Sequence, residues 1–233
     1  MSMEPIEESM KKILGNLQSV LPSDEYEKNR LERESKKSAW EVKTKAEEEN
    51  KRRANLWESS GIPHRHTIAY RDMPNAGPWA QELEKINKKQ GEGFLCVLMG
   101  RRGTGKTQMS VCSIHNACEN LRPSMYIKAQ DLFISLRQAF RKDGDSESEI
   151  IRRFTGPSFL VIDAMEERGE TPFENRLLNH IIDKRYDNCD DTLLITNQTP
   201  EAFEDSAGPS IISRIHETGG KIVCDWDSFR KKV

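Results

Sequence analysis

The sequence predicts an α/β fold in which helices cover both faces of a parallel β-sheet. Short apolar runs typical of strands alternate with helix-type segments from residue 94 onward. The first of these runs leads directly into a glycine-rich loop, and the loop leads into a helix-type segment without glycine or proline. The chain before residue 60 is helix-type but poor in apolar residues, so the core must come from the later part. Strands that alternate with helices in this way indicate βαβ units.

The expected elements follow one another in a regular order. We predict strands over residues 94–99, 124–127, 159–163, 192–196 and 221–224. We predict helices over residues 79–90, 108–120, 129–141, 146–154, 173–186 and 211–215. A helix-type segment separates each strand from the next, which is the connection that parallel pairing requires.

The N-terminal part is expected to be helical with little core of its own. Apolar residues between Ile6 and Leu21 recur every three or four positions, which is the stripe of an amphipathic helix. Residues 25–58 lack glycine, proline and cysteine and are rich in Glu, Lys and Arg. They form either a solvated, salt-bridged helix or a helical arm that docks on a partner, and we favour the arm. We therefore predict an arm over residues 1–60, a connector over 61–90 and an α/β domain over 91–233.

Composition excludes several classes of protein. Of the 233 residues 32% are charged, yet the net charge is only −2, so any contact with nucleic acid must come from a local basic patch. No apolar run is long enough to span a membrane, and the N-terminus lacks the pattern of a signal peptide. The five cysteines are widely spaced without a C-x-x-C pair. We therefore expect a cytoplasmic protein with reduced thiols and no zinc.

The glycine-rich loop is the most informative motif. It matches G-x-x-x-x-G-K-[ST] and consists of Gly100, Arg101, Arg102, Gly103, Thr104, Gly105, Lys106 and Thr107. The glycines let the backbone approach phosphates, and the N–H groups at the start of the following helix donate to the anion. Lys106 is expected to contact the β- and γ-phosphates, and the Thr107 hydroxyl to bind Mg²⁺. The motif predicts binding of ATP or GTP with Mg²⁺.

Two polar residues at strand ends extend this site. Asp163 ends the buried run 159–162 and is expected to be the acid on the Mg²⁺ side. Asn197 follows the strand 192–196, where it either hydrogen-bonds the γ-phosphate or the attacking water, or only ends the strand.

Hydrolysis is less secure than binding. Many P-loop ATPases place a Glu directly after the Asp to orient the attacking water, but this chain has Ala164 there. Acids stand nearby at positions 166, 167 and 170, but side chains so displaced point elsewhere unless the loop is rearranged. We therefore expect at most a weak ATPase.

Arg214 is an isolated cation on a short apolar helix. It is either a salt-bridged surface residue or an arginine finger that reaches the nucleotide of an adjacent subunit. The residues alone leave both interpretations open.

Taken together, these residues resemble the AAA+ ATPases of the DnaC-type replicative helicase loaders, a DnaC/IstB-like family. The resemblance spans roughly residues 57–233. Besides the P-loop, it is carried by the segments Trp57–Arg65, Leu160–Asp163, Ile181–Tyr186, Thr196–Asn197 and Asp225–Arg230. The P-loop is generic, whereas Asp183-Lys184-Arg185-Tyr186 and the Trp226 segment are more specific and favour a loader over the related transposition helper ATPases.

The resemblance implies an AAA+ core of five parallel strands, with ATP as the nucleotide and Arg214 as the arginine finger. Many AAA+ proteins carry a helical lid, but we expect none here, because the sequence ends soon after its last predicted strand. It implies self-association through AAA+ interfaces and docking of a hexameric replicative helicase on the N-terminal arm. It also implies contact with single-stranded DNA near residues 129–154. The candidate DNA-binding residues are Phe133, Arg137, Phe140, Arg141 and Lys142. Basic side chains there would track phosphates, and aromatic ones would stack on bases.

Two alternatives to a helicase loader stay open. A transposition helper ATPase of the IstB type would bind duplex DNA and a transposase. A nucleotide-binding adaptor that never hydrolyses ATP would explain Ala164. A small-molecule P-loop kinase is less favoured, because no acceptor-binding signature is present.

Overall fold

The computed structural model describes residues 8, 10–12, 24–69, 73–74, 76–139 and 147–230. Most of the apolar stripe between Ile6 and Leu21 lies outside these residues, as do Phe140, Arg141 and Lys142. The chain divides into two compact units, Met1–Asn50 and Lys51–Val233. Each unit is described by itself below.

The second unit is built on a five-stranded parallel sheet, as the sequence predicts. The strands are β1 (Leu95–Gly100), β2 (Ser124–Lys128), β3 (Phe159–Asp163), β4 (Asp191–Ile195) and β5 (Gly220–Cys224). Their order across the sheet is β2-β3-β4-β1-β5, and every neighbouring pair is parallel. The strand that precedes the glycine-rich loop therefore lies between β4 and β5, and the carboxyl ends of β1, β3 and β4 meet at one edge.

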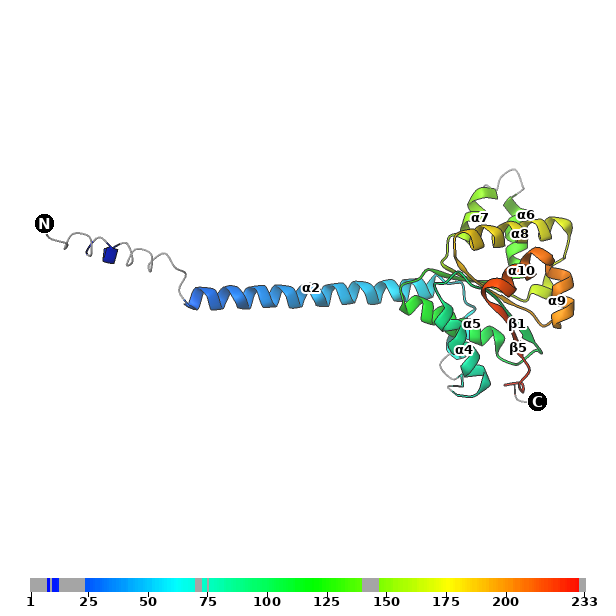
Figure 1. The fold of residues 1–233 in the computed structure, drawn as a ribbon, viewed down its shortest axis with the longest axis horizontal. Coiled ribbons are helices and arrows are strands. Elements are labelled where there is room, and N and C mark those ends of the chain that lie inside the picture. Colours follow the sequence, from blue (N-terminus) through cyan, green and yellow to red (C-terminus); the bar gives the residue numbers. More distant parts are fainter. Residues whose placement is uncertain are drawn as a thin grey trace. The chain divides into compact units, whose positions relative to one another are not determined.

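Helices connect the strands and cover both faces of the sheet (Figure 1). They are α3 (His64–Ala69), α4 (Pro78–Lys89), α5 (Lys106–Glu119), α6 (Ala129–Ala139), α7 (Glu147–Thr155), α8 (Pro172–Asp187), α9 (Pro200–Ala207) and α10 (Pro209–Thr218). A 3₁₀ turn, η2 (Met165–Glu167), follows β3. The sequence reading missed α9, although its Thr199 cap and first-turn Pro200 are ordinary helix-start signals.

Alternate residues of the strands enter two separate cores. Cys96 and Leu98 of β1 pack with α4 and α5, whereas Leu95, Val97 and Met99 face α6, α8 and α10. Figure 1 shows α4 and α5 on one side of the sheet and α6, α8 and α10 on the other. Because the central strands are buried on both faces, they read as continuous apolar runs in the sequence.

The predicted connector contributes to the core. Residues 51–90 belong to the same compact unit as the glycine-rich loop. Trp79 and Ile86 of α4 are buried against α5, and Leu56 and Trp57 pack on the same cluster. The α/β unit therefore begins well before residue 91, and the boundary lies between Asn50 and Lys51.

Buried polar side chains hold the ends of the elements together. Asp191 is fully buried and accepts hydrogen bonds from the backbone N–H groups of Gly91, Gly93 and Phe94 at 2.7–3.2 Å. Arg185 is also buried and donates to the carbonyls of residues 154, 157 and 191 and to a threonine hydroxyl. Burial lowers the pKa of Arg185 to about 10, which still leaves the side chain charged at neutral pH.

The first unit contains most of α2 (Asp24–Glu58), a helix of 35 residues. Ion pairs one turn apart run along it, joining Arg30 to Glu34, Lys37 to Glu41 and Lys43 to Glu47. The large apolar side chains that α2 carries in this unit are exposed: Leu31, Val42 and Trp40, the last at 66%. Within the described residues, none of the helices combines the length and the apolar character needed to cross a membrane.

Candidate nucleotide site

The glycine-rich loop joins β1 to α5 in the conformation that the motif predicts. Gly103 and Gly105 have φ angles of 93° and 80°, which side chains with a Cβ rarely adopt. A Cβ on Gly103 would collide with the Ser228 hydroxyl, and one on Gly105 would press on the rings of Trp79 and Phe229. α5 begins at Lys106, so the first N–H groups of the helix are oriented toward the space beside the loop.

Lys106 is folded back onto the loop and onto a neighbouring strand end. Its Nζ donates to the Gly100 carbonyl at 2.7 Å, to the Arg101 carbonyl at 2.9 Å and to Asn197 Oδ1 at 2.9 Å. Burial lowers the pKa of Lys106, and the nearby thiol of Cys224 and the carboxylate of Asp163 oppose this shift. The ammonium group therefore links the loop to the residue predicted to contact a γ-phosphate.

Asp163 and Thr107 meet at the candidate Mg²⁺ position. The Thr107 hydroxyl donates to Asp163 Oδ2 at 2.8 Å, and the Ala164 N–H donates to Oδ1 at 2.7 Å. Within the described ranges no group of three or more His, Cys, Asp and Glu side chains could hold a metal ion. One hydroxyl and one carboxylate nevertheless suit Mg²⁺, which takes its remaining oxygen ligands from phosphates and water.

Tyr126 also belongs to this site, although the sequence pattern indicates only that it lies in a strand. Its hydroxyl donates to Asp163 Oδ2 at 2.7 Å from the neighbouring strand β2. Burial, and then the charge of Asp163, raises the pKa of Tyr126, so the phenol stays protonated and remains a donor. The hydrogen bond fixes the carboxylate that faces Thr107.

Asn197 forms a bridge between Lys106 and an acid. Its Nδ2 and its backbone N–H both donate to the Glu166 carboxylate, the second at 3.1 Å to Oε2. The Thr196 hydroxyl donates to the same oxygen at 3.2 Å. Lys106, Asn197 and Glu166 therefore form a connected row, in which the Asn197 amide lies between the Lys106 ammonium group and the Glu166 carboxylate.

Lys106, Thr107, Tyr126, Asp163 and Asn197 border an open cleft of about 570 Å³, whereas Glu166 lies behind Asn197 and does not line it. One wall comes from α3 and Met73. There His66 Nδ1 pairs with Gln108 Oε1 at 2.8 Å, and the Gln108 amide donates to the His66 carbonyl. Another part of the rim comes from Phe229 and Arg230 of the C-terminal segment. There the Trp226 indole N–H donates to the Thr104 carbonyl at 2.8 Å, and the Phe229 N–H donates to the Gly103 carbonyl. The C-terminal segment thus supports the loop from outside.

Comparison with known proteins places this architecture in a family. A family model described as IstB-like ATP binding protein matches residues 43–233. The chain belongs to this family. The replicative helicase loader DnaC of Escherichia coli (strain K12) is 24% identical over 138 residues, which cover 59% of this chain and 56% of DnaC. This IstB-like chain therefore spans about half the length of the curated relatives that it matches.

Solved structures share the fold of this IstB-like protein. A crystal structure of the DnaC helicase loader superposes with a TM-score of 0.60 and 18% identity, over 69% of this chain and 99% of that one. AMPPCP-bound DnaA from Aquifex aeolicus superposes with a TM-score of 0.56 and 16% identity, over 67% of this chain and 49% of that one. The expected resemblance to DnaC-type AAA+ proteins is confirmed.

Arg214 of this IstB-like protein is bound by its own chain. Its Nη2 lies 3.0 Å from Asp183 Oδ1, and its guanidinium carbon lies 5.1 Å from the centre of the Tyr186 ring. Nη1 donates to the carbonyl and the hydroxyl of Ser210, one turn earlier in α10. Both interpretations of Arg214 therefore stay open. It forms a salt bridge near the surface, and it could still leave that salt bridge to contact the nucleotide of a neighbouring chain.

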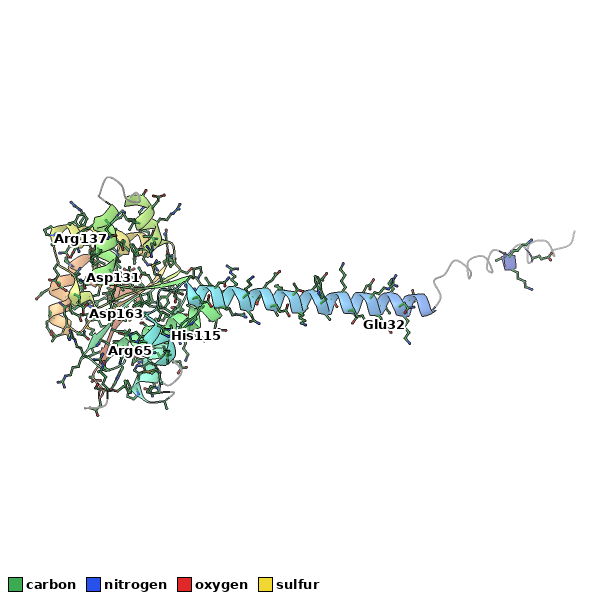
Figure 2. The ribbon with its side chains drawn as sticks, turned by 180° about the vertical axis from the view of Figure 1, so that it is seen from behind. Glu32, Arg65, His115, Asp131, Arg137 and Asp163 are labelled. Carbon is green, nitrogen blue, oxygen red and sulfur yellow. The ribbon has the colours of Figure 1, made fainter. Side chains whose placement is uncertain are left out.

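The candidate DNA-binding residues are only partly available. Phe133 is 1% exposed and belongs to the core of the sheet, so it cannot stack on a base in this conformation. Arg137 is half-exposed and pairs with the buried carboxylate of Glu174 at 2.9 Å. In Figure 2, Arg137 lies well apart from Asp163, which marks the nucleotide cleft. Other basic side chains on the described part of this region are exposed: Lys128, Arg152 and Arg153.

Proposed function

We propose that this protein is an ATP-dependent loader that binds a replicative DNA helicase and delivers it onto single-stranded DNA. The observation that carries the proposal is the row of Lys106, Asn197 and Glu166 beside the Thr107–Asp163 pair, all at the carboxyl edge of the sheet. This arrangement supports a site that responds to a γ-phosphate. Membership of the IstB-like family and similarity to proteins named replicative helicase loaders support the role of the site.

The residues present would fit ATP with Mg²⁺. Lys106 would exchange its loop carbonyls and the Asn197 oxygen for phosphate oxygens, since a charge-assisted hydrogen bond to an anion is stronger than one to a carbonyl. Thr107 and Asp163 would hold the metal ion, which neutralises phosphate charge when bound. Release of the Asn197 amide from Lys106 would then make the strand end sensitive to the presence of a γ-phosphate, and ATP would act as a conformational switch.

Two exposed surfaces support the proposed partners. α2 presents Trp40 and Val42 to solvent on a helix that otherwise carries ion pairs, and we assign this surface to the helicase. The basic residues of α6 and α7 are assigned to single-stranded DNA, with Arg152 and Arg153 as the exposed cations. Chains would associate through AAA+ interfaces, with Arg214 reaching the neighbour's nucleotide.

A loading assay tests the proposal. Wild-type protein with ATP is expected to place a hexameric replicative helicase on closed circular single-stranded DNA, detected as unwinding of an annealed strand. Lys106→Ala should abolish loading but still capture the helicase through α2. Lys88→Ala, an exposed lysine paired with Glu84 on α4, is the matched control and should load normally. Normal loading by Lys106→Ala would refute the nucleotide switch.

A transposition helper ATPase is the second candidate, favoured by the IstB-like description of the family. Such a protein would prefer duplex DNA and would capture a transposase instead of a helicase. Binding of the full chain to duplex and to single-stranded DNA of equal length, each with ATP, separates the two functions. A clear preference for duplex DNA would favour the helper.

A further inference from the structure

The loop after β3 has Ala164 where many P-loop ATPases have a Glu, and it brings a different acid, Glu166, into contact with Asn197. Ala164 has φ 56° and ψ 52°, the left-handed conformation, and so turns the chain sharply at the end of the strand. Residues 165–167 then form the η2 turn, which is closed by a hydrogen bond from the Glu167 N–H to the Ala164 carbonyl at 2.9 Å. Met165 is buried in the core and fixes the turn. The loop is therefore rearranged, and position 166 returns toward the sheet.

The Glu166 carboxylate is held at the end of β4 by Asn197, the predicted γ-phosphate sensor, although Glu166 itself does not line the cleft. It accepts hydrogen bonds from the backbone and the side chain of Asn197 and from the Thr196 hydroxyl. The same Asn197 amide accepts a hydrogen bond from Lys106 Nζ at 2.9 Å. The Asn197 side chain thus links the Glu166 carboxylate to the Lys106 ammonium group of the P-loop.

The other acids of the loop are less well placed. Glu167 lines the cleft, but its side chain is exposed. Glu170 is exposed, and its carbonyl accepts a hydrogen bond from the Asn175 side chain. Glu166 is the acid of this loop that contacts the predicted γ-phosphate sensor.

We propose that Glu166 orients and deprotonates the attacking water, in place of the absent acid at position 164. This inference rests on the proposed ATP site. The water oxygen forms a bond to the γ-phosphorus while the bond to the β,γ-bridging oxygen breaks, and ADP leaves with that electron pair. The proton of the water passes to Glu166 and then to solvent, so the products are ADP, phosphate and one proton. Asn197 holds the carboxylate in position and senses the phosphate.

Phosphate release by the full chain tests the assignment. With ATP and Mg²⁺, and with single-stranded DNA and a helicase added or omitted, Glu166→Gln is expected to reduce the rate about 100-fold or more, the usual contribution of a general base. Binding of a fluorescent ATP analogue should change less than threefold, which shows that the variant folds. Glu170→Gln is the matched control and should keep the wild-type rate.

Three results would overturn the assignment. They are a Glu166→Gln rate equal to that of wild type, a comparable loss in Glu167→Gln but not in Glu166→Gln, and no phosphate release by the wild type in any mixture. The last result would leave a non-hydrolysing switch, which can still load a helicase. Phosphate release tests the role of Glu166, and helicase delivery tests the loader function. The failure of one proposal can therefore be told from the failure of the other.

Discussion

The nucleotide cleft and the face formed by α8 and α10 both carry cationic groups, but they differ in what those groups bind. In the cleft, Lys106 is held by two backbone carbonyls and by an amide oxygen, acceptors without charge. On the other face, Arg214 is paired with a carboxylate and an aromatic ring of its own chain. A phosphate can replace neutral acceptors directly, whereas Arg214 must leave an ion pair first.

On the proposed function, this difference would divide the work at the nucleotide site between two chains. The cleft takes its P-loop, Asp163 and Asn197 from one chain, so the proposed nucleotide site needs no second chain for these residues. Arg214 sits with its side chain 23% exposed in an ion pair with Asp183, which is 44% exposed. The pair is only partly exposed and contributes on the order of 1 kcal/mol, so a neighbouring chain that binds Arg214 must replace that contribution.

The strongest test of this division uses two inactive variants. Arg214→Ala should reduce phosphate release about 1,000-fold, since an arginine finger stabilises the charge of the transition state. Lys106→Ala should be inactive because it cannot hold the nucleotide. A mixture of the two should regain part of the activity, because an intact cleft then meets an intact Arg214 on its neighbour. Phosphate release by the mixture makes the measurement, and a mixture as inactive as its components would contradict a shared site.

Nucleotide binding by dilute single chains should depend on Lys106 in the cleft but not on Arg214 on α10. Lys106→Ala is expected to weaken binding of a fluorescent ATP analogue about 100-fold, equal to roughly 3 kcal/mol, since hydrogen bonds to charged groups are worth about 1.5–3 kcal/mol each. Arg214→Ala should bind as wild type does, and Lys88→Ala serves as the lysine control. Equal losses in the Lys106 and Arg214 variants would show that Arg214 acts within its own chain.

A smaller effect is expected from the hydroxyl that fixes Asp163. Tyr126→Phe removes a hydrogen bond of 2.7 Å to Oδ2 and keeps the ring in the core. We expect Mg²⁺-dependent nucleotide binding to weaken about fivefold, corresponding to about 1 kcal/mol. Binding measured in EDTA should not change, because the hydroxyl acts on the carboxylate that holds the metal ion. A loss of the same size with and without Mg²⁺ would point to a packing defect.

The residues predicted from the sequence are those whose role depends on neighbours along the chain. Lys106 and Thr107 are fixed by a contiguous motif, and the buried strands appear as uninterrupted apolar runs. Tyr126 could not be found this way, because its role depends on β2 lying beside β3. In that register Lys128 lies opposite Asp163, and Tyr126, two residues earlier on β2, reaches the same carboxylate. Strand order is a property of the tertiary structure, and an apolar run with one tyrosine does not reveal it.

Glu166 shows a second limit of sequence reasoning. Its position depends on the left-handed conformation of Ala164, which an alanine rarely adopts and no sequence pattern signals. Phe133 shows a related limit, because an aromatic residue between basic ones can lie on a surface or in a core. Its place in the period of α6, between Leu132 and Leu136, puts it in the core.

The smallest expected effect concerns the ion pair that Arg214 must leave. Asp183→Asn removes the negative charge but keeps the size of the side chain, so Arg214 should be released more readily to a neighbouring chain. We expect ATP-dependent self-association to strengthen about two- to threefold, in line with the small worth of an exposed ion pair. Sedimentation at several concentrations makes the measurement, and Asp187→Asn, at the end of the same helix, is the control. Weaker association of Asp183→Asn would mean that Asp183 positions Arg214 for the neighbour instead of competing with it.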